Sequence, residues 1–240
     1  MFKKIKSTLV VMTLILTTTV NAQTKSDQTL DTKQQAMVGI AALTGKGDLS
    51  KLPAQLHAGL DAGLSINQIK EALTHVYAYA GFPRSLRGLQ TFMAVLDERK
   101  AKGIEDVLGA DASTISDDRS KYERGKAILE ELSGVAETGP KTGYAAFAPT
   151  IEVFLKEHLF ADIFERDVLT FQQRELVTIS VLSGIGGVEP MLRSHLNLSL
   201  NVGLTPSQLQ EFIGVIKLSV GKREARAAQK VLDEVLASKK

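Results

Sequence analysis

Two side chains able to exchange protons, His75 and Tyr79, stand one helical turn apart in the segment HVYAYAGFP, residues 75–83. At about 100° per residue they are neighbours on one flank of a helix, away from its apolar stripe. Such a pair could pass a proton or donate hydrogen bonds to developing negative charge. The alternative is an ordinary helix histidine, satisfied by solvent or by Glu71 one turn earlier.

A carboxylate within an apolar run, Glu175, is the second candidate. Its neighbours predict a largely buried helix, and a buried carboxylate is costly unless it is paired. As a functional group it would be a general acid or base. The alternative is a structural salt bridge with Arg166, Arg174 or Arg193.

His195 is the third candidate for proton transfer, and Arg193 beside it could bind a substrate carboxylate. The alternative for Arg193 is a solvated surface charge. One carboxylate with His75 and His195 is also a ligand set for transition metals. Their spacing forms no compact motif, so we expect no metal. The remaining histidines, His57 and His158, match no pattern and are expected at the surface.

Composition excludes several classes of chemistry. The 240 residues contain no cysteine, which removes disulfides, thiolate nucleophiles, sulfur-based zinc sites and CxxC redox centres. No glycine-rich dinucleotide motif follows a strand, so we expect no cofactor. With 44% hydrophobic residues the chain can bury a real core. Any catalysis must therefore use oxygen and nitrogen groups.

Residues 1–22 have the order of a secretory signal peptide: three lysines, an apolar run over 9–16, and small residues ending at Ala22. The run is shorter than the roughly 20 residues of a membrane span. We expect cleavage and export to the periplasm, with an uncleaved anchor as the alternative. Cleavage would leave 26 basic and 27 acidic residues, a net charge of −1. We therefore expect neither nucleic acid nor membrane as a partner.

The chain contains an internal repeat. The sequence from Leu30 aligns with that from Leu169, and Gly63 and Gly81 align with Gly203 and Gly221. We place the first repeat at 23–101, a Gly/Ser/Asp-rich linker at 102–120 and the second repeat at 121–240. Neither copy alone could cover both faces of its helices, so we expect one all-α unit with a pseudo-twofold axis.

Helix signals recur in both copies. Ser65 with Gln68, and Thr205 with Gln208, have the spacing of a capping box. Gly81 and Gly221 are expected to end these helices as left-handed caps. Further helices are predicted at 84–101, 121–133, 150–166 and 222–237. The stretch 134–149 is predicted to be a long loop, a candidate lid or pocket edge.

Four segments together resemble the carboxymuconolactone decarboxylase family, relatives of alkylhydroperoxidase D: YERGKAILEEL, FERDVLTFQQRELVTISVL, LRSHLNLSLNVGLT and HVYAYAGFP. The resemblance implies an all-helical fold, assembly into rings and pockets where family units meet. A three-subunit ring of tandem chains is the homo-oligomer it suggests. The redox branch of the family uses a CxxC pair, whose absence here excludes peroxide reduction by that mechanism.

The family pattern has a Glu after Arg on one helix, a His on the next, and a His ahead of Tyr-x-Gly-x-Pro on a third. Arg174-Glu175 and His195 match its first two parts, and His75 with Tyr79 matches its third. The aligned positions in the opposite copies lack these groups, and they are Gln35, Ala36, Gln55, Val215 and Ser219. The losses are complementary, which predicts one composite site per tandem pair.

The resemblance implies a cofactor-independent lyase or isomerase acting on a small carboxylated, unsaturated lactone or related acid. His195 or Glu175 would deliver a proton, while His75 and Tyr79 would hydrogen-bond an oxyanion. Two alternatives stand beside it. One is a non-catalytic helical binding or assembly module, in which Glu175, His195 and His75 do not converge. The other is a cysteine-free oxidoreductase that requires a bound cofactor.

Overall fold

The computed structural model describes residues 29–239, which form helices and connections without any strand. The predicted signal peptide, residues 1–22, lies outside this range. Within the range no helix is long and apolar enough to cross a membrane. The first copy consists of α2 (Thr32–Lys46), α3 (Leu52–Asp61) and α4 (Ile66–Ala101). The second contains α8 (Phe171–Ile185), α9 (Glu189–Asn201), α10 (Pro206–Ser219) and α11 (Lys222–Ala237).

The helix starts repeat as the sequence predicts. Both expected capping boxes are present, at Ser65 before α4 and at Thr205 before α10. A second matched pair, at Asp31 and Thr170, begins α2 and α8. Each satisfies two free N–H groups at a helix start. The same local chemistry therefore fixes the same helix boundaries twice.

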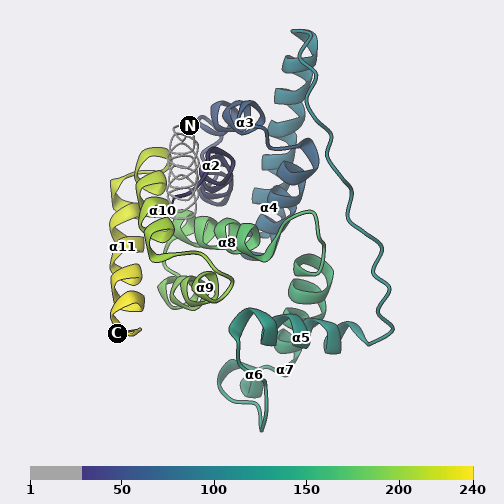
Figure 1. Ribbon diagram of the computed structural model, residues 1–240, viewed down its shortest axis with the longest axis vertical. Helices are drawn as coiled ribbons and strands as arrows, with labels where there is room; N and C mark the ends of the chain where they lie inside the picture. Colours follow the sequence, from purple (N-terminus) through teal and green to yellow (C-terminus); the bar gives the residue numbers. More distant parts are fainter. Residues whose placement is uncertain (1–28, 240) are drawn as a thin grey trace, which may run out of the picture.

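The two copies are interlocked around α2 and α8, which pack together more extensively than any other pair of helices (Figure 1). The first half of α4 lies against α8 of the other copy, and α10 lies against α2. Each copy thus covers the first helix of its partner with its own third helix. This exchange confirms the predicted all-α, pseudo-twofold unit, and it brings residues of α4 beside residues of α8.

Glycines allow α2 and α8 to cross closely. A Cβ at Gly184 would lie 2.5 Å from the carbonyl oxygen of Ala42, and one at the equivalent Gly45 would lie 3.0 Å from the side chain of Val181. The first distance is shorter than real Cβ contacts, and a carbonyl cannot rotate away as a side chain can. The crossing therefore depends on small residues at equivalent positions in both copies.

The sequence prediction of left-handed caps at Gly81 and Gly221 is wrong in detail. Both glycines have positive φ, 78° and 155°, but their ψ angles are 166° and 169°. This extended backbone breaks the helix and starts another immediately. In α4 the second half runs on to Ala101, with Pro83 in its first turn, where a missing N–H costs little.

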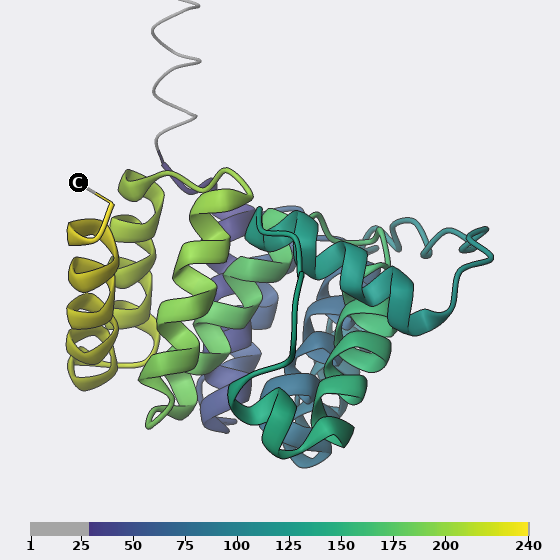
Figure 2. The same cartoon turned by 90° about the horizontal axis from the view of Figure 1, so that it is seen from below.

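The first part of the predicted second repeat, residues 121–164, forms a separate layer that precedes α8 in the sequence. It contains α5 (Lys121–Ser133), α6 (Gly143–Phe147), α7 (Pro149–Phe154) and the π-helix η1 (Leu155–Phe164). Figure 2 shows α5 and η1 side by side, at the opposite end of the molecule from α10 and α11. The two pack closely because Gly125 lies directly on the Lys156 carbonyl. The predicted helices at 121–133 and 150–166 are thus present.

Ion pairs hold the 134–149 stretch onto this layer. Lys156 is buried and bonds to Glu152 and Glu137, while Lys141 bonds to Glu152. The stretch contains α6 and is therefore not wholly a loop. Its role as a lid stays a prediction.

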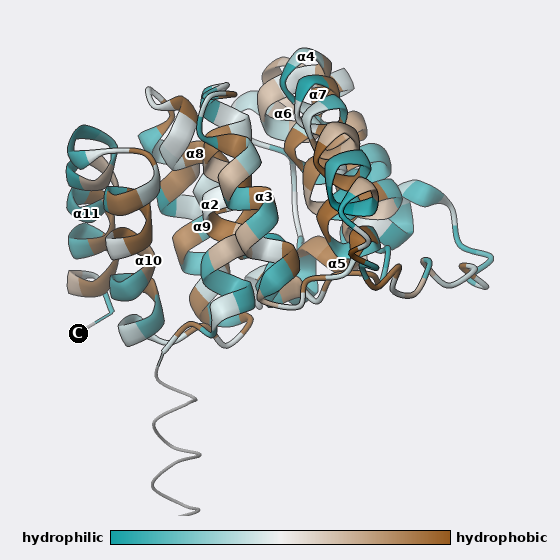
Figure 3. Cartoon of the chain, turned by 90° about the horizontal axis from the view of Figure 1, so that it is seen from above, coloured by the Kyte–Doolittle hydropathy of each residue, from teal (hydrophilic) through white to brown (hydrophobic). Residues whose placement is uncertain are grey.

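Hydropathy follows these contacts. Figure 3 shows hydrophobic bands where helices face one another and hydrophilic residues on the outer side of α11. The buried residues of α11 recur at three- and four-residue intervals, the period of a helix, and they are Glu224, Ala225, Ala228, Val231, Leu232 and Val235. The predicted helix at 222–237 therefore closes the core of the second copy.

We predict opposite effects for two helical Gly→Ala substitutions. Gly184→Ala should lower the free energy of unfolding by about 1–3 kcal/mol, because the new methyl group meets the Ala42 backbone. Gly214→Ala, an exposed helix position with nothing within 4 Å, should raise it by about 0.5–1 kcal/mol. Urea unfolding of both variants measures this. Stabilisation by both would show that the α2–α8 crossing is looser than described.

Candidate active site

His75 is buried at the contact of α4 with α8. Its Nε2 lies 2.8 Å from Thr178 Oγ1, and its Nδ1 lies 3.2 Å from an Nη of Arg174. A guanidinium only donates, so Nδ1 accepts and the Nε2 proton is donated to Thr178. Both ring nitrogens are therefore engaged by protein partners, and α8 supplies both partners.

Electrostatics favour the neutral form of this imidazole. Burial, then the positive charge of Arg174 and the proximity of His195, holds the pKa of His75 well below its usual 6.5. Desolvation disfavours a charged ring, and a neighbouring cation adds to the effect. His75 is thus a neutral Nε2–H tautomer near pH 7.

Arg174 is a fully buried cation at the centre of a polar network. Its Nη2 donates to Glu71 Oε1 at 2.8 Å and to the backbone carbonyl of Arg166. The side chain of Arg166 is the second cation on this carboxylate, and it donates to both Glu71 oxygens at 2.9–3.1 Å. The network ties α4, α8 and the end of the η1 layer together. Burial lowers the pKa of Arg174, and Glu71 opposes that shift.

Glu175 and His195 form the second polar group. Glu175 Oε2 lies 2.9 Å from His195 Nδ1, the carboxylate is fully buried, and the imidazole is 13% exposed. Because the carboxylate accepts from Nδ1–H, the outer Nε2 is oriented to exchange a proton. This arrangement has the form of an acid–base dyad.

Tyr79 joins the two groups. Its ring stacks on His75 with centroids 5.4 Å apart and meets His195 edge-on, also at 5.4 Å. The ring of Phe164, from η1, also contacts His75, with centroids 5.0 Å apart. The η1 layer thus covers the cluster with an aromatic ring.

Two buried oxygens of this cluster lack a hydrogen-bond partner among residues 29–239, the Tyr79 hydroxyl and Glu175 Oε1. Burial, and then the negative charge of Glu175, raises the pKa of Tyr79 above its usual value. The contact with Thr178 opposes the shift without reaching normal hydrogen-bond geometry. Unpaired buried polar atoms are uncommon and costly. A neutral donor and a carboxylate oxygen are therefore free to meet a ligand.

The structure brings together four of the five predicted site residues, Glu175, His195, His75 and Tyr79. Arg193 is the exception, because its side chain is 46% exposed and pairs with Glu234. Arg193 is thus a surface charge, the alternative to substrate binding that the sequence left open. His57 and His158 are likewise partly exposed, at 27% and 46%, and lie apart from this network.

Sequence reasoning missed part of the cluster. It gave Thr178 no role, and it considered Glu71 only as a partner of His75. The signal for Thr178 was its position four residues after Arg174, which places both on one face of a buried helix. Phe164 begins the segment FERDVLTFQQRELVTISVL, which carried the family resemblance, but the sequence gave this residue no role in the site.

The location related to this cluster by the pseudo-twofold axis has different residues at the equivalent positions. Glu211, the equivalent of Glu71, accepts from Gln35, which replaces Arg174. Gly39 stands in place of Thr178, and the Gln55 side chain fills the space where its Cβ would be. The positions that match Glu175, His195, His75 and Tyr79 hold Ala36, Gln55, Val215 and Ser219, which are not acid–base groups. The structure therefore holds one cluster of these groups and one counterpart that lacks them.

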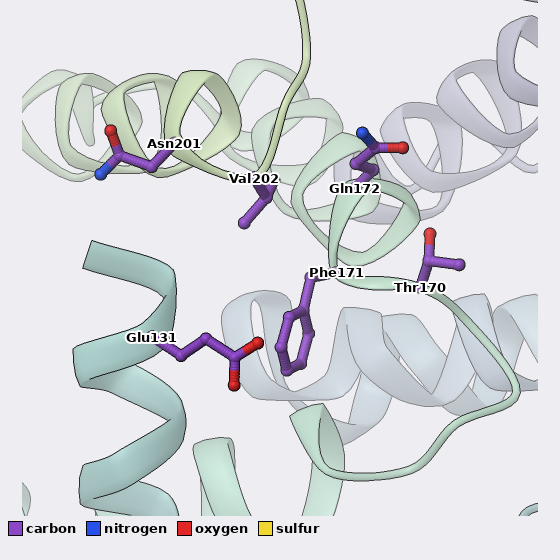
Figure 4. Close-up of a pocket in the computed structure, with 6 residues that line it drawn as sticks. All are labelled: Glu131, Thr170, Phe171, Gln172, Asn201 and Val202. Carbon is purple, nitrogen blue, oxygen red and sulfur yellow. The ribbon is translucent and has the colours of Figure 1, made fainter. Parts of the chain in front are cut away.

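Cavities near the cluster differ in what lines them. One of about 400 Å³ is lined partly by Tyr79 and Ala80. Another, of about 340 Å³, lies between α5, the start of α8 and the end of α9. In Figure 4 Phe171 and Val202 point into it, facing Glu131. None of its lining residues belongs to the cluster. Across residues 29–239 no group of three His, Cys, Asp or Glu could hold a metal ion.

Comparison with known proteins agrees with the repeated fold. The sequence model of the carboxymuconolactone decarboxylase family matches twice, over residues 14–92 and 149–234. The chain belongs to the carboxymuconolactone decarboxylase family. Its first matched region begins inside the predicted signal peptide. One relative, 4-carboxymuconolactone decarboxylase of Acinetobacter baylyi, is 29% identical over 119 residues, which cover 49% of this chain and 88% of the relative. This protein is therefore a tandem, two-copy family member.

We predict that Glu71→Gln destabilises the protein by about 3 kcal/mol or more, because it leaves the buried Arg174 charge uncompensated. Glu98→Gln is the control, since it removes an exposed ion pair with Lys102 and should change stability little. Chemical denaturation of the two variants measures the difference. Equal, small losses would mean that Arg174 is solvated.

We also predict that stability falls as the pH drops below 6.5. The unfolded chain binds a proton at His75 there while the folded chain does not, so acid favours unfolding. The stabilisation is complete above pH 6.5 and is lost towards the lower, folded pKa. Urea midpoints between pH 7.5 and 5 should decline less steeply in His75→Gln than in the control His158→Gln. Parallel slopes would show that His75 titrates normally.

Proposed function

We propose that this protein is a cofactor-independent lyase or isomerase that acts on a small carboxylated, unsaturated lactone or related acid. The observation that carries the proposal is the convergence of Glu175, His195 and Tyr79 in one buried cluster with two oxygens free. The name of the Acinetobacter relative supports the substrate class. A non-catalytic module does not require this convergence.

The proposed reaction is the loss of CO₂ from a carbon conjugated to a carbonyl group. The bond to the carboxylate breaks, CO₂ leaves, and its electron pair delocalises onto the carbonyl oxygen as a dienolate. Protonated His195, oriented by Glu175 through Nδ1, then gives its Nε2 proton to a carbon of the dienolate. The neutral His195 regains a proton from solvent through its exposed edge.

The Tyr79 hydroxyl is the proposed donor to the developing oxyanion. Its raised pKa keeps the hydroxyl protonated. Because it makes no hydrogen bond within residues 29–239, it can donate to a ligand without breaking one. A preorganised donor in a dry site contributes strongly to stabilising such charge. His75 acts here as a positioning residue that stacks on Tyr79, since both of its nitrogens are occupied.

We predict that Glu175→Gln and His195→Asn each lower kcat by about 10²–10⁴-fold, the usual contribution of acid–base catalysis. The control Glu98→Gln alters an exposed carboxylate outside the cluster and should keep wild-type turnover. Release of CO₂ from 4-carboxymuconolactone and from a panel of related unsaturated acids is the measurement. Full turnover in the two variants, or none by the wild type across the panel, would contradict the proposal.

A further inference from the structure

The cavity that Tyr79 shares lies where the two copies meet. Gly45 and Gly184, equivalent residues at the ends of α2 and α8, both line it. Ala80, at the break of α4, and Arg223, at the start of α11, complete its edge. With a volume of about 400 Å³, it can admit a small organic molecule. It opens onto the same tyrosine that the proposed function uses.

Positive charge dominates this cavity. Its lining includes Lys46, Arg84 and Arg223 and no acidic residue. Beside it Glu224 accepts from Lys46 and from Arg223, each at 2.9 Å. Contact with Lys46 lowers the pKa of Glu224 to about 2, so this carboxylate stays ionised and balances one cation. Two positive charges remain in excess.

Arg84 is the cation without a partner. Among residues 29–239 Arg84 makes no hydrogen bond or ion pair with another residue, and its side chain is exposed. Its guanidinium occupies the space over Gly47, where a Cβ would lie 1.4 Å from Nη1. The glycine therefore lets Arg84 lie against the end of α2, next to Lys46.

The basic residues are not a by-product of the repeat. Lys46 aligns with Ile185 in the second copy, Arg84 with Glu224, and Arg223 with Pro83 in the first. The cavity straddles the pseudo-twofold axis, yet its cations break that symmetry. The composite cluster beneath it is asymmetric in the same way.

We propose that Lys46, Arg84 and Arg223 form an anion-binding subsite that holds a carboxylate of a small organic acid beside Tyr79. This inference rests on the proposed function and extends it to substrate recognition. Arg84 and Arg223 lie in the first turns of helical segments, whose free N–H groups also favour an anion. The alternative role is neutralisation of the C-terminal ends of α2 and α8, which requires no ligand.

The test is direct binding of succinate, a dicarboxylate probe, to the full-length protein by NMR titration. The wild type should bind succinate saturably, with shifts confined to the cavity. Arg84→Gln with Arg223→Gln should weaken binding by about tenfold or more, since charge-assisted contacts are lost. Arg87→Gln is the control, because Arg87 is exposed on α4 and bonds to Gln90. It should bind as the wild type does.

No saturable binding to the wild type, or equal binding to all variants, would overturn the proposal. Equal affinity for succinate, acetate and chloride would also overturn it, since that pattern reflects general attraction of anions. If the double variant does not fold, Arg84→Gln decides alone, because Arg84 has no structural partner to lose. Succinate binding is independent of turnover. The subsite can therefore stand when the catalytic proposal fails, and the reverse also holds.

Discussion

The architecture of the site depends on one buried cation, Arg174. A guanidinium fully removed from water is tolerated only where hydrogen bonds and an opposite charge replace the solvent. Here Glu71 supplies the charge, and His75 and the Arg166 carbonyl accept further hydrogen bonds, while Nε has no hydrogen-bond partner among residues 29–239. These partners lie on α4 and just after η1, whereas Arg174 itself is on α8. Satisfying Arg174 therefore fixes how α4 and the η1 layer sit on α8, and it fixes the tautomer of His75.

The interlocked packing of the two copies explains how residues from both repeats meet in one cluster. Each third helix covers the first helix of the other copy, so each half-site draws on both repeats. A tandem chain therefore has two equivalent locations of this kind, and their residues can diverge independently. At the second one Gln35 replaces the buried cation, and Glu211 still accepts from it. The fold keeps the contact that holds the helices together, while the groups for proton transfer are gone.

Local interactions made much of the fold predictable. Capping boxes at Ser65 and Thr205 and the apolar period of α11 depend on residues within a few positions of one another, and the structure has each as expected. The geometry at Gly81 was less predictable. Glycine permits the positive φ found there, but the extended ψ depends on the packing of both halves of α4. The sequence therefore predicted that the helix is interrupted at Gly81, but not the backbone conformation of the interruption.

For the site, the sequence by itself determined which groups could do chemistry and that the two copies had lost complementary halves. It excluded thiol chemistry outright, because there is no cysteine. Only the tertiary structure decided which groups meet. It gave Glu175 to His195 instead of to an arginine, and it left Arg193 at the surface. Partners distant in the sequence are chosen by helix packing, which sets distances that residue type and spacing do not encode.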